Sequence, residues 1–166
     1  MGLDCRIDAM SARTAAAASG ACAFFLVGVV TSLAQGVPPW DSRCDARGCS
    51  HSRALSESAT LRRIATVSVL TEAQATGATL AVALPLGLAL EPGVQFVLGD
   101  TVWPAPFKVC FPDGCSAAIT LDEAMLAQLL SAPDIAVRYF AFNDGRAIMI
   151  DAPLGGLAEA VASRRP

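Results

Sequence analysis

Residues Phe107–Leu130 read FKVCFPDGCSAAITLDEAMLAQLL and hold the strongest local folding signals of the chain. Two runs of strand-forming residues, Phe107–Phe111 and Ser116–Leu121, flank the sequence PDG at positions 112–114. Proline presets one backbone angle of a turn, aspartate bonds to the backbone nearby, and glycine tolerates positive φ. This combination favours a tight turn between two antiparallel strands, and we predict a β-hairpin here.

The residues after this hairpin predict a short helix. Thr120 and Glu123 have the spacing of a capping box, in which two side chains bond reciprocally to backbone N–H groups at a helix start. Apolar residues then recur at helical spacing until Pro133, which a helix interior does not tolerate. These apolar residues are Ala124, Met125, Leu126, Leu129 and Leu130. We therefore predict one helix, Asp122–Leu130, inserted into a chain of strands.

Short strand-like runs separated by turn residues make up most of the remaining chain. A first strand is expected after Trp40, and the apolar run Ala78–Leu84 fits either a buried strand or a short buried helix. Further strands are predicted at Leu61–Leu70, Val94–Leu98, Ile135–Phe142 and Ala147–Ile150. The sequence NDG at 143–145 is a second hairpin signal, and a terminal helix could form at Leu157–Ser163. The pattern predicts a mostly β fold, either an antiparallel β-sandwich or a partly open barrel, with one inserted helix.

The N-terminus has the three parts of a secretory signal peptide. Basic residues precede an apolar stretch at 21–30, and Ser32-x-Ala34 supplies the small residues of a cleavage site. We predict cleavage after Ala34, so that residues 1–34 are the leader and residues 35–166 form a single domain. Two alternatives stay open: the apolar stretch could anchor the chain in a membrane, and synthesis could start at Met10.

The charge balance argues against nucleic acid as a partner. The chain has 12 Lys and Arg residues against 15 Asp and Glu, a formal net charge of −3, and no basic stripe. Proteins that bind nucleic acid or an anionic membrane surface present a basic patch. We expect neither partner, and we expect membrane contact only through the leader before its removal. The leader predicts a periplasmic or outer-membrane-associated protein.

Four cysteines lie in the predicted exported domain, as the pairs Cys44/Cys49 and Cys110/Cys115. In an oxidising compartment such cysteines are disulfides by default. The predicted hairpin brings Cys110 and Cys115 within disulfide reach, which by exclusion leaves Cys44 with Cys49, around another predicted tight turn. A redox enzyme typically requires Cys-x-x-Cys, which neither pair has. A zinc site of four cysteines, or one with His51 in place of a cysteine, would have ligand gaps at the edge of the usual spacing. The sequence therefore favours two structural disulfides.

Few other residues could support catalysis or binding. His51, the only histidine of the chain, lies on a polar segment, and we expect a solvent-exposed loop histidine without a catalytic role. Trp103 and Phe107 flank the rigid sequence Pro-Ala-Pro. This predicted loop could be a binding surface, or its aromatic side chains could pack beneath it. We predict no catalytic, metal-binding or cofactor-binding residue.

The motif Phe107-x-x-Cys110-x-x-x-Gly114-Cys115-x-Ala117, followed by the predicted helix, resembles the invasion-associated locus B family of exported alphaproteobacterial proteins. Weaker matches extend the resemblance over nearly all of Trp40–Ala160; they are Trp40-x-x-x-Cys44, Leu84–Leu90 with Pro92-Gly93, and Leu154-x-Gly156. The gap between Cys44 and Cys49 is shorter than is usual for the family, and Leu157 replaces a common aromatic residue. The resemblance implies a periplasmic or outer-membrane-associated protein and carries over no catalytic residue.

Two classes of function stay open from the sequence. The first is a non-enzymatic envelope protein that binds an envelope or host protein, because the chain has few catalytic residue types and two predicted disulfides. The second is a thiol-dependent or metal-dependent envelope enzyme that uses the cysteines and His51. We favour the first class. The family name describes a phenotype, and no residue of the chain indicates invasion itself.

Overall fold

A computed structural model describes residues 39–56 and 62–163 of the chain. Residues Gln35–Pro166 form one compact unit, and the predicted leader, residues 1–34, lies outside the described residues. In the described part, no helix has the length and apolar character that crossing a membrane requires. All the strands and helices of the described residues belong to the compact unit.

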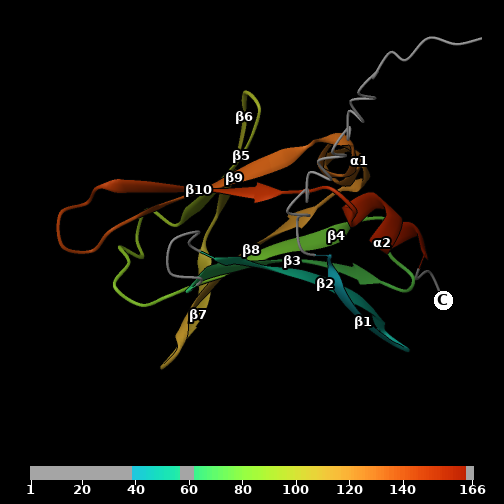
Figure 1. The fold of residues 1–166 in the computed structure, drawn as a ribbon, viewed down its shortest axis with the longest axis horizontal. Coiled ribbons are helices and arrows are strands. Elements are labelled where there is room, and N and C mark those ends of the chain that lie inside the picture. The colour runs from blue at the N-terminus through green and yellow to red at the C-terminus, as the bar shows by residue number, and fades with distance from the viewer. Residues whose placement is uncertain (1–38, 57–61, 164–166) are drawn as a thin grey trace, which may run out of the picture. The chain divides into compact units, whose positions relative to one another are not determined.

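The larger of two antiparallel sheets has six strands. They are β1 (Asp41–Asp45), β2 (Gly48–Ser56), β3 (Arg63–Glu72), β4 (Ala78–Leu84), β7 (Phe107–Phe111) and β8 (Gly114–Leu121). Their order is β1-β2-β3-β4-β8-β7, so the edges are β1 and β7, each the outer strand of a hairpin. In Figure 1 both edge hairpins bend away from the second sheet.

The smaller sheet has four strands: β5 (Val94–Leu98), β6 (Thr101–Ala105), β9 (Asp134–Phe140) and β10 (Ala147–Pro153). Their order is β10-β9-β5-β6, which makes β10 and β6 the edges. Helix α1 (Glu123–Ser131) connects β8 to β9, and helix α2 (Leu157–Ser163) follows β10. Figure 1 shows the smaller sheet above one face of the larger sheet.

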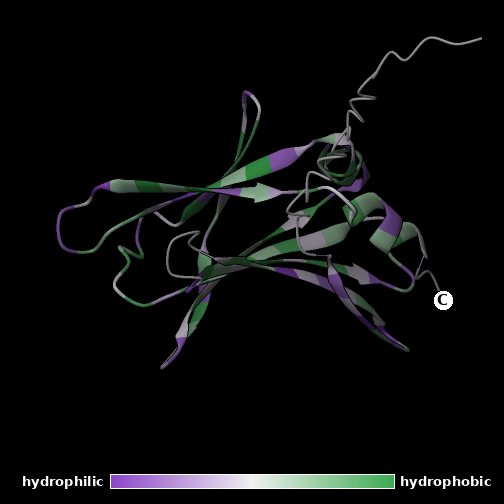
Figure 2. Cartoon of the chain, in the orientation of Figure 1, coloured by the Kyte–Doolittle hydropathy of each residue, from purple (hydrophilic) through white to green (hydrophobic). Residues whose placement is uncertain are grey.

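The hydrophobic core lies between the two sheets. Alternate side chains of a strand point to opposite faces, and on β3 this buries Val67 and Val69. Phe96 of the smaller sheet belongs to the same buried cluster, as do Leu129 of α1 and Leu157 of α2. By contrast, Figure 2 shows that the tip of the β9–β10 hairpin is hydrophilic. Burial of apolar side chains from both sheets and both helices therefore holds the layers together.

A buried arginine connects the two sheets. Arg53 of β2 is 4% exposed, and its guanidinium donates hydrogen bonds to the backbone carbonyls of Pro153 and Gly155, the latter at 2.8 Å. The same guanidinium lies 4.6 Å from the centre of the Trp40 ring. Burial lowers the pKa of Arg53, because the charged form loses contact with water. Arg53 thus links β2 to the end of β10, 100 residues further along the chain.

The predicted fold class is confirmed as a sandwich of two antiparallel sheets with two short helices. Both predicted hairpins are present, as β7–β8 and β9–β10. The turn predicted between Cys44 and Cys49 joins β1 to β2. The ambiguous run Ala78–Leu84 is a strand, and Leu157–Ser163 is helical as predicted. Turn residues and local periodicity were therefore sufficient for these elements.

Two local predictions are wrong. Thr120 does not cap helix α1, because its backbone is paired with Thr79 inside the sheet. Asp122 is the N-cap instead, and its side chain accepts a hydrogen bond from the Met125 N–H at 2.8 Å. The predicted loop around Pro104 is the end of strand β6. Proline, which lacks an N–H donor, is tolerated there because β6 is an edge strand.

Candidate functional site

The outer face of the larger sheet, which points away from the core, carries mostly small side chains along its four central strands. Inward positions on β2, β3, β4 and β8 are mostly buried, and the residues between them point outward. The alternation also places Ile64 and Glu72, near the two ends of β3, on this side. The outward residues at the centre of the four strands are Ser50, Ser52, Ala54, Thr66, Ser68, Leu70, Thr79, Ala81, Ala83, Ser116, Ala118 and Thr120. None of these central residues is charged. Leu70 is the one large apolar side chain among them and is 40% exposed.

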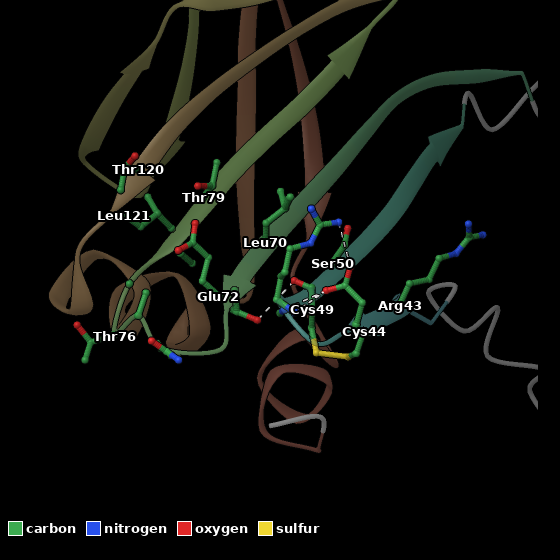
Figure 3. A pocket seen from close by; sticks show the side chains of 18 of the residues that line it. Arg43, Cys44, Cys49, Ser50, Leu70, Glu72, Thr76, Thr79, Thr120 and Leu121 are labelled. Atoms are coloured by element: carbon green, nitrogen blue, oxygen red, sulfur yellow. Dashed lines mark hydrogen bonds and ion pairs between the residues drawn. A yellow bond between two sulfur atoms is a disulfide. The ribbon is translucent and has the colours of Figure 1, made fainter. Parts of the chain in front are cut away.

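One row of these residues forms the floor of a groove of about 890 Å³ (Figure 3). The strand register pairs Ser50 with Leu70, Leu70 with Thr79, and Thr79 with Thr120. Figure 3 shows Leu70, Thr79 and Thr120 side by side across their strands. The floor therefore combines one apolar side chain with hydroxyl groups that can both donate and accept hydrogen bonds.

Two turns at the same end of the sheet form the walls of the groove. They are the tip of the β1–β2 hairpin and the turn between β3 and β4. In the hairpin tip, the Asp45 carboxylate accepts hydrogen bonds from the backbone N–H groups of Arg47 at 2.8 Å and Gly48 at 3.2 Å. The bond from Arg47 is the main cause that lowers the pKa of Asp45. Glu72 stands at the end of β3, so the groove has an uncharged floor and a charged rim.

The two edge hairpins of the larger sheet are built alike. Each contains the sequence Cys-x-x-x-Gly-Cys, and each disulfide, Cys44–Cys49 or Cys110–Cys115, joins two residues paired in register. A Cβ atom added to Gly48 or Gly114 would lie 2.0 Å or 2.3 Å, respectively, from a carbonyl oxygen of the adjacent strand. Only glycine fits at that distance. The cysteine spacing is visible in the sequence. The requirement for glycine is not, because it comes from the strand that lies next to each hairpin, β3 beside Gly48 and β4 beside Gly114.

Replacing Cys110 and Cys115 together by serine should leave the domain folded and lower its free energy of unfolding by roughly 2 kcal/mol, because closing so short a loop restricts the unfolded chain only slightly. Urea unfolding of the purified, disulfide-bonded protein measures this change. The matched double variant of Cys44 and Cys49 should lose a similar amount. Non-reducing peptide mapping that joined a cysteine of one hairpin to a cysteine of the other would contradict the local pairing.

The prediction that His51 is exposed on a loop is wrong. His51 lies in β2 with its side chain in the core and is 0% exposed. Its Nδ1 atom is 2.8 Å from the hydroxyl oxygen of Ser42 on the neighbouring strand. The alternation of β2 explains this position, because it places Cys49, His51, Arg53 and Leu55 all inward. His51 therefore belongs to the packing of the sheet, out of reach of a solute.

The two aromatic residues proposed for a binding loop lie on strands. Trp103 of β6 is 6% exposed and belongs to the core cluster. Phe107 begins β7 and is partly buried against the same cluster. Their positions fit the alternative considered from the sequence, in which these aromatic side chains pack beneath the surface.

Neither a cluster of metal ligands nor a free cysteine thiol is found among the described residues. Within residues 39–56 and 62–163, no group of three or more His, Cys, Asp or Glu side chains is arranged to hold a metal ion. The four cysteines of these residues are all in disulfides. What the groove provides is hydroxyl groups, one exposed leucine and a charged rim.

Fold and site together define an extracytoplasmic β-sandwich protein with two disulfide-linked edge hairpins and an open sheet face. The sequence profile of the family described as "Invasion associated locus B (IalB) protein" matches residues 40–165. The chain belongs to this family.

Relatives and a solved structure agree with this assignment. Two proteins named "Invasion protein B homolog", from Brucella abortus strain 2308 and from Brucella abortus biovar 1 strain 9-941, are each 27% identical over 168 residues. Each alignment covers 97% of this chain and 92% of the relative. The crystal structure of invasion associated protein B from Bartonella henselae has a TM-score of 0.65 at 17% identity, covering 78% of this chain and 93% of that one. That likeness shows a shared fold.

Proposed function

We propose that this protein is a non-enzymatic binding domain of the bacterial cell envelope, and that its binding surface is the outer face of the larger sheet. The observation that carries the proposal is the groove of about 890 Å³ over Ser50, Leu70, Thr79 and Thr120. Ligand-binding pockets are commonly concave and mostly apolar, with a few polar groups that fix orientation. An exposed leucine among hydroxyl groups has this character, and the short side chains around it let a partner approach the backbone closely.

The state of the cysteines and of the histidine supports binding over catalysis. A catalytic thiol is a partly exposed thiolate, whereas the cysteines of the described residues are joined in disulfides. A catalytic or metal-binding histidine must reach its substrate or ion, whereas His51 is fully buried. The competing function is a thiol-dependent or metal-dependent envelope enzyme. Thiol titration and metal analysis of the periplasmic protein separate the two, because free thiols or stoichiometric zinc would favour the enzyme.

The partner that we propose is a protein of the envelope or of a host cell, and the proposed location is the periplasm or the outer membrane. Disulfides persist in oxidising compartments, and the IalB relatives are named for invasion. We favour a general envelope role for this chain, because none of its residues identifies a host protein.

A photo-cross-linking side chain placed at Leu70 should give a discrete adduct in intact cells, because Leu70 is the exposed apolar residue of the groove floor. The matched control is Val102 of β6, which is 44% exposed on the other sheet. Adducts are detected as shifted bands on denaturing gels and identified by mass spectrometry. An adduct at Val102 together with none at Leu70 would assign the binding surface to the smaller sheet instead.

A further inference from the structure

The charges on the hairpin wall of the groove already balance one another. Arg43 pairs with Asp41 at 3.2 Å, and Arg47 pairs with Asp45 at 3.3 Å. Residues 41–48 therefore carry two positive and two negative charges. This wall adds no net charge to the groove, so the remaining charged side chains decide which partner the groove favours.

Glu72 is the groove carboxylate that is left for a partner. Asp122, another carboxylate of the groove, caps helix α1 by accepting a hydrogen bond from the Met125 N–H. The Glu72 side chain is exposed, and within residues 39–56 and 62–163 its carboxylate forms no ion pair. Its neighbour in register on β2 is Gly48, which has no side chain to cover it. Figure 3 shows the Glu72 side chain directed toward Thr79 of the groove floor.

Glu72 and Leu70 lie on the same side of β3. They are two residues apart, and alternate side chains of a strand share a face. Their positions are about 7 Å apart along the strand, at the usual rise per residue. An extended polypeptide has the same rise, so its alternate side chains have the same spacing. An extended segment along the end of β3 can therefore place one side chain at Leu70 and the next but one at Glu72.

We propose that the groove binds an extended segment of the protein partner, in which a lysine or arginine stands two residues from an apolar side chain. This inference rests on the proposed function, because it assigns the chemistry of the partner to the same groove. The apolar side chain contacts Leu70, and the cation pairs with the Glu72 carboxylate. The hydroxyl groups of Thr79 and Thr120 beside Leu70 can bond to the backbone of the segment, since a hydroxyl both donates and accepts.

Charge complementarity favours a basic segment over an acidic or a purely apolar one. An acidic side chain at this position would face Glu72, and like charges opposed across an interface cost several kcal/mol. The nearby guanidinium groups of Arg43 and Arg47 are already paired with carboxylates. A purely apolar segment would cover Glu72 without supplying an opposite charge, and burying an unpaired charge is costly.

Short synthetic peptides test both the charge and the spacing. The probes are the blocked peptides Gly-Leu-Ser-Lys-Gly and Gly-Lys-Ser-Leu-Gly, which cover both chain directions, and their binding is followed by NMR chemical shifts. At least one should bind with a Kd on the order of 1 mM. Counterparts with glutamate in place of lysine should bind at least about fivefold more weakly. Counterparts with leucine and lysine adjacent should also bind more weakly, because adjacent side chains of an extended chain point to opposite sides.

Three results with these peptides would overturn the proposal. The first is failure of both lysine peptides to bind. The second is binding of the glutamate peptides that is equal to or tighter than that of the lysine peptides. The third is equal binding of the adjacent-residue peptides, which would contradict the spacing set by Leu70 and Glu72.

A substitution that keeps the shape of the side chain tests the role of Glu72. Glu72→Gln should weaken binding of the lysine peptides about three- to fivefold, the upper range for an exposed ion pair. Glu91→Gln is the matched control, because Glu91 is also exposed and does not line the groove. It should leave binding unchanged. Equal effects of the two variants would show that overall charge, rather than a contact with Glu72, attracts the peptide, and would refute the inference.

Photo-cross-linking in intact cells separates this inference from the proposed function. With the photo-reactive side chain at Leu70, the additional substitution Glu72→Lys should reduce the adduct at least about fivefold, whereas Glu91→Lys should leave it unchanged. An adduct that Glu72→Lys does not reduce would overturn the basic segment and leave the groove as the binding surface. The absence of any adduct at Leu70 would overturn both.

Discussion

Replacing Arg53 by alanine should lower the free energy of unfolding by roughly 3 to 5 kcal/mol. The substitution removes the donors that bond to the carbonyl oxygens of Pro153 and Gly155. A buried carbonyl that loses its partner costs about 1 to 3 kcal/mol. The contact between the guanidinium and the Trp40 ring is lost as well, and a desolvated cation–π contact contributes up to about 2 kcal/mol. The loss is large because all these contacts converge on one side chain that joins the two sheets.

Urea unfolding of Arg53→Ala, followed by tryptophan fluorescence, measures this effect. Arg53→Lys is a second variant that keeps the charge but loses the planar fork, and it should fall between alanine and the native protein. The matched control is Arg43→Ala, because Arg43 pairs with Asp41 at 3.2 Å on the exposed surface, where such pairs contribute at most about 1 kcal/mol. If Arg53→Ala were no more destabilising than Arg43→Ala, the buried guanidinium would not be holding the sheets together.

Replacing His51 by alanine should cost roughly 2 to 4 kcal/mol, because it opens a cavity in the core and removes a hydrogen-bonded group. The side chain is fully buried and lies 2.8 Å from the Ser42 hydroxyl. An exposed loop histidine, as expected from the sequence, would cost almost nothing. The change in the free energy of unfolding therefore distinguishes a buried His51 from an exposed one.

The control for His51 is the next residue along the strand. Ser52 points to the outer face of the sheet, so Ser52→Ala should change stability by less than about 0.5 kcal/mol, as surface substitutions usually do. Equal and small effects of both variants would place His51 on the surface. A variant that loses a bound metal ion together with stability would instead favour the metal-dependent enzyme.

The candidate groove could not be predicted from the sequence. Ser50, Leu70, Thr79 and Thr120 come from four strands, and only the strand register aligns them. A serine or threonine at an outward position gives no local signal of a site, because such residues are common on any exposed sheet face.

The sequence by itself determined the elements whose causes are local. Turn residues at 112–114 and 143–145 defined two hairpins, the apolar periodicity after Leu121 defined a helix, and the first of these hairpins set the spacing of one cysteine pair. Signals of this kind act over a few residues, through backbone angles and short-range hydrogen bonds.

Only the tertiary structure decided which face of each strand is covered and which polar residues are buried. The inward positions of β2 include His51 and Arg53, and a sequence pattern assigns such residues to the surface because burying them alone is costly. Arg53 is stabilised in the core by carbonyls that follow it by 100 and 102 residues. Partners so distant along the chain come together only when the protein folds. The hydrogen bonds that stabilise the buried Arg53 therefore form only once both sheets are in place.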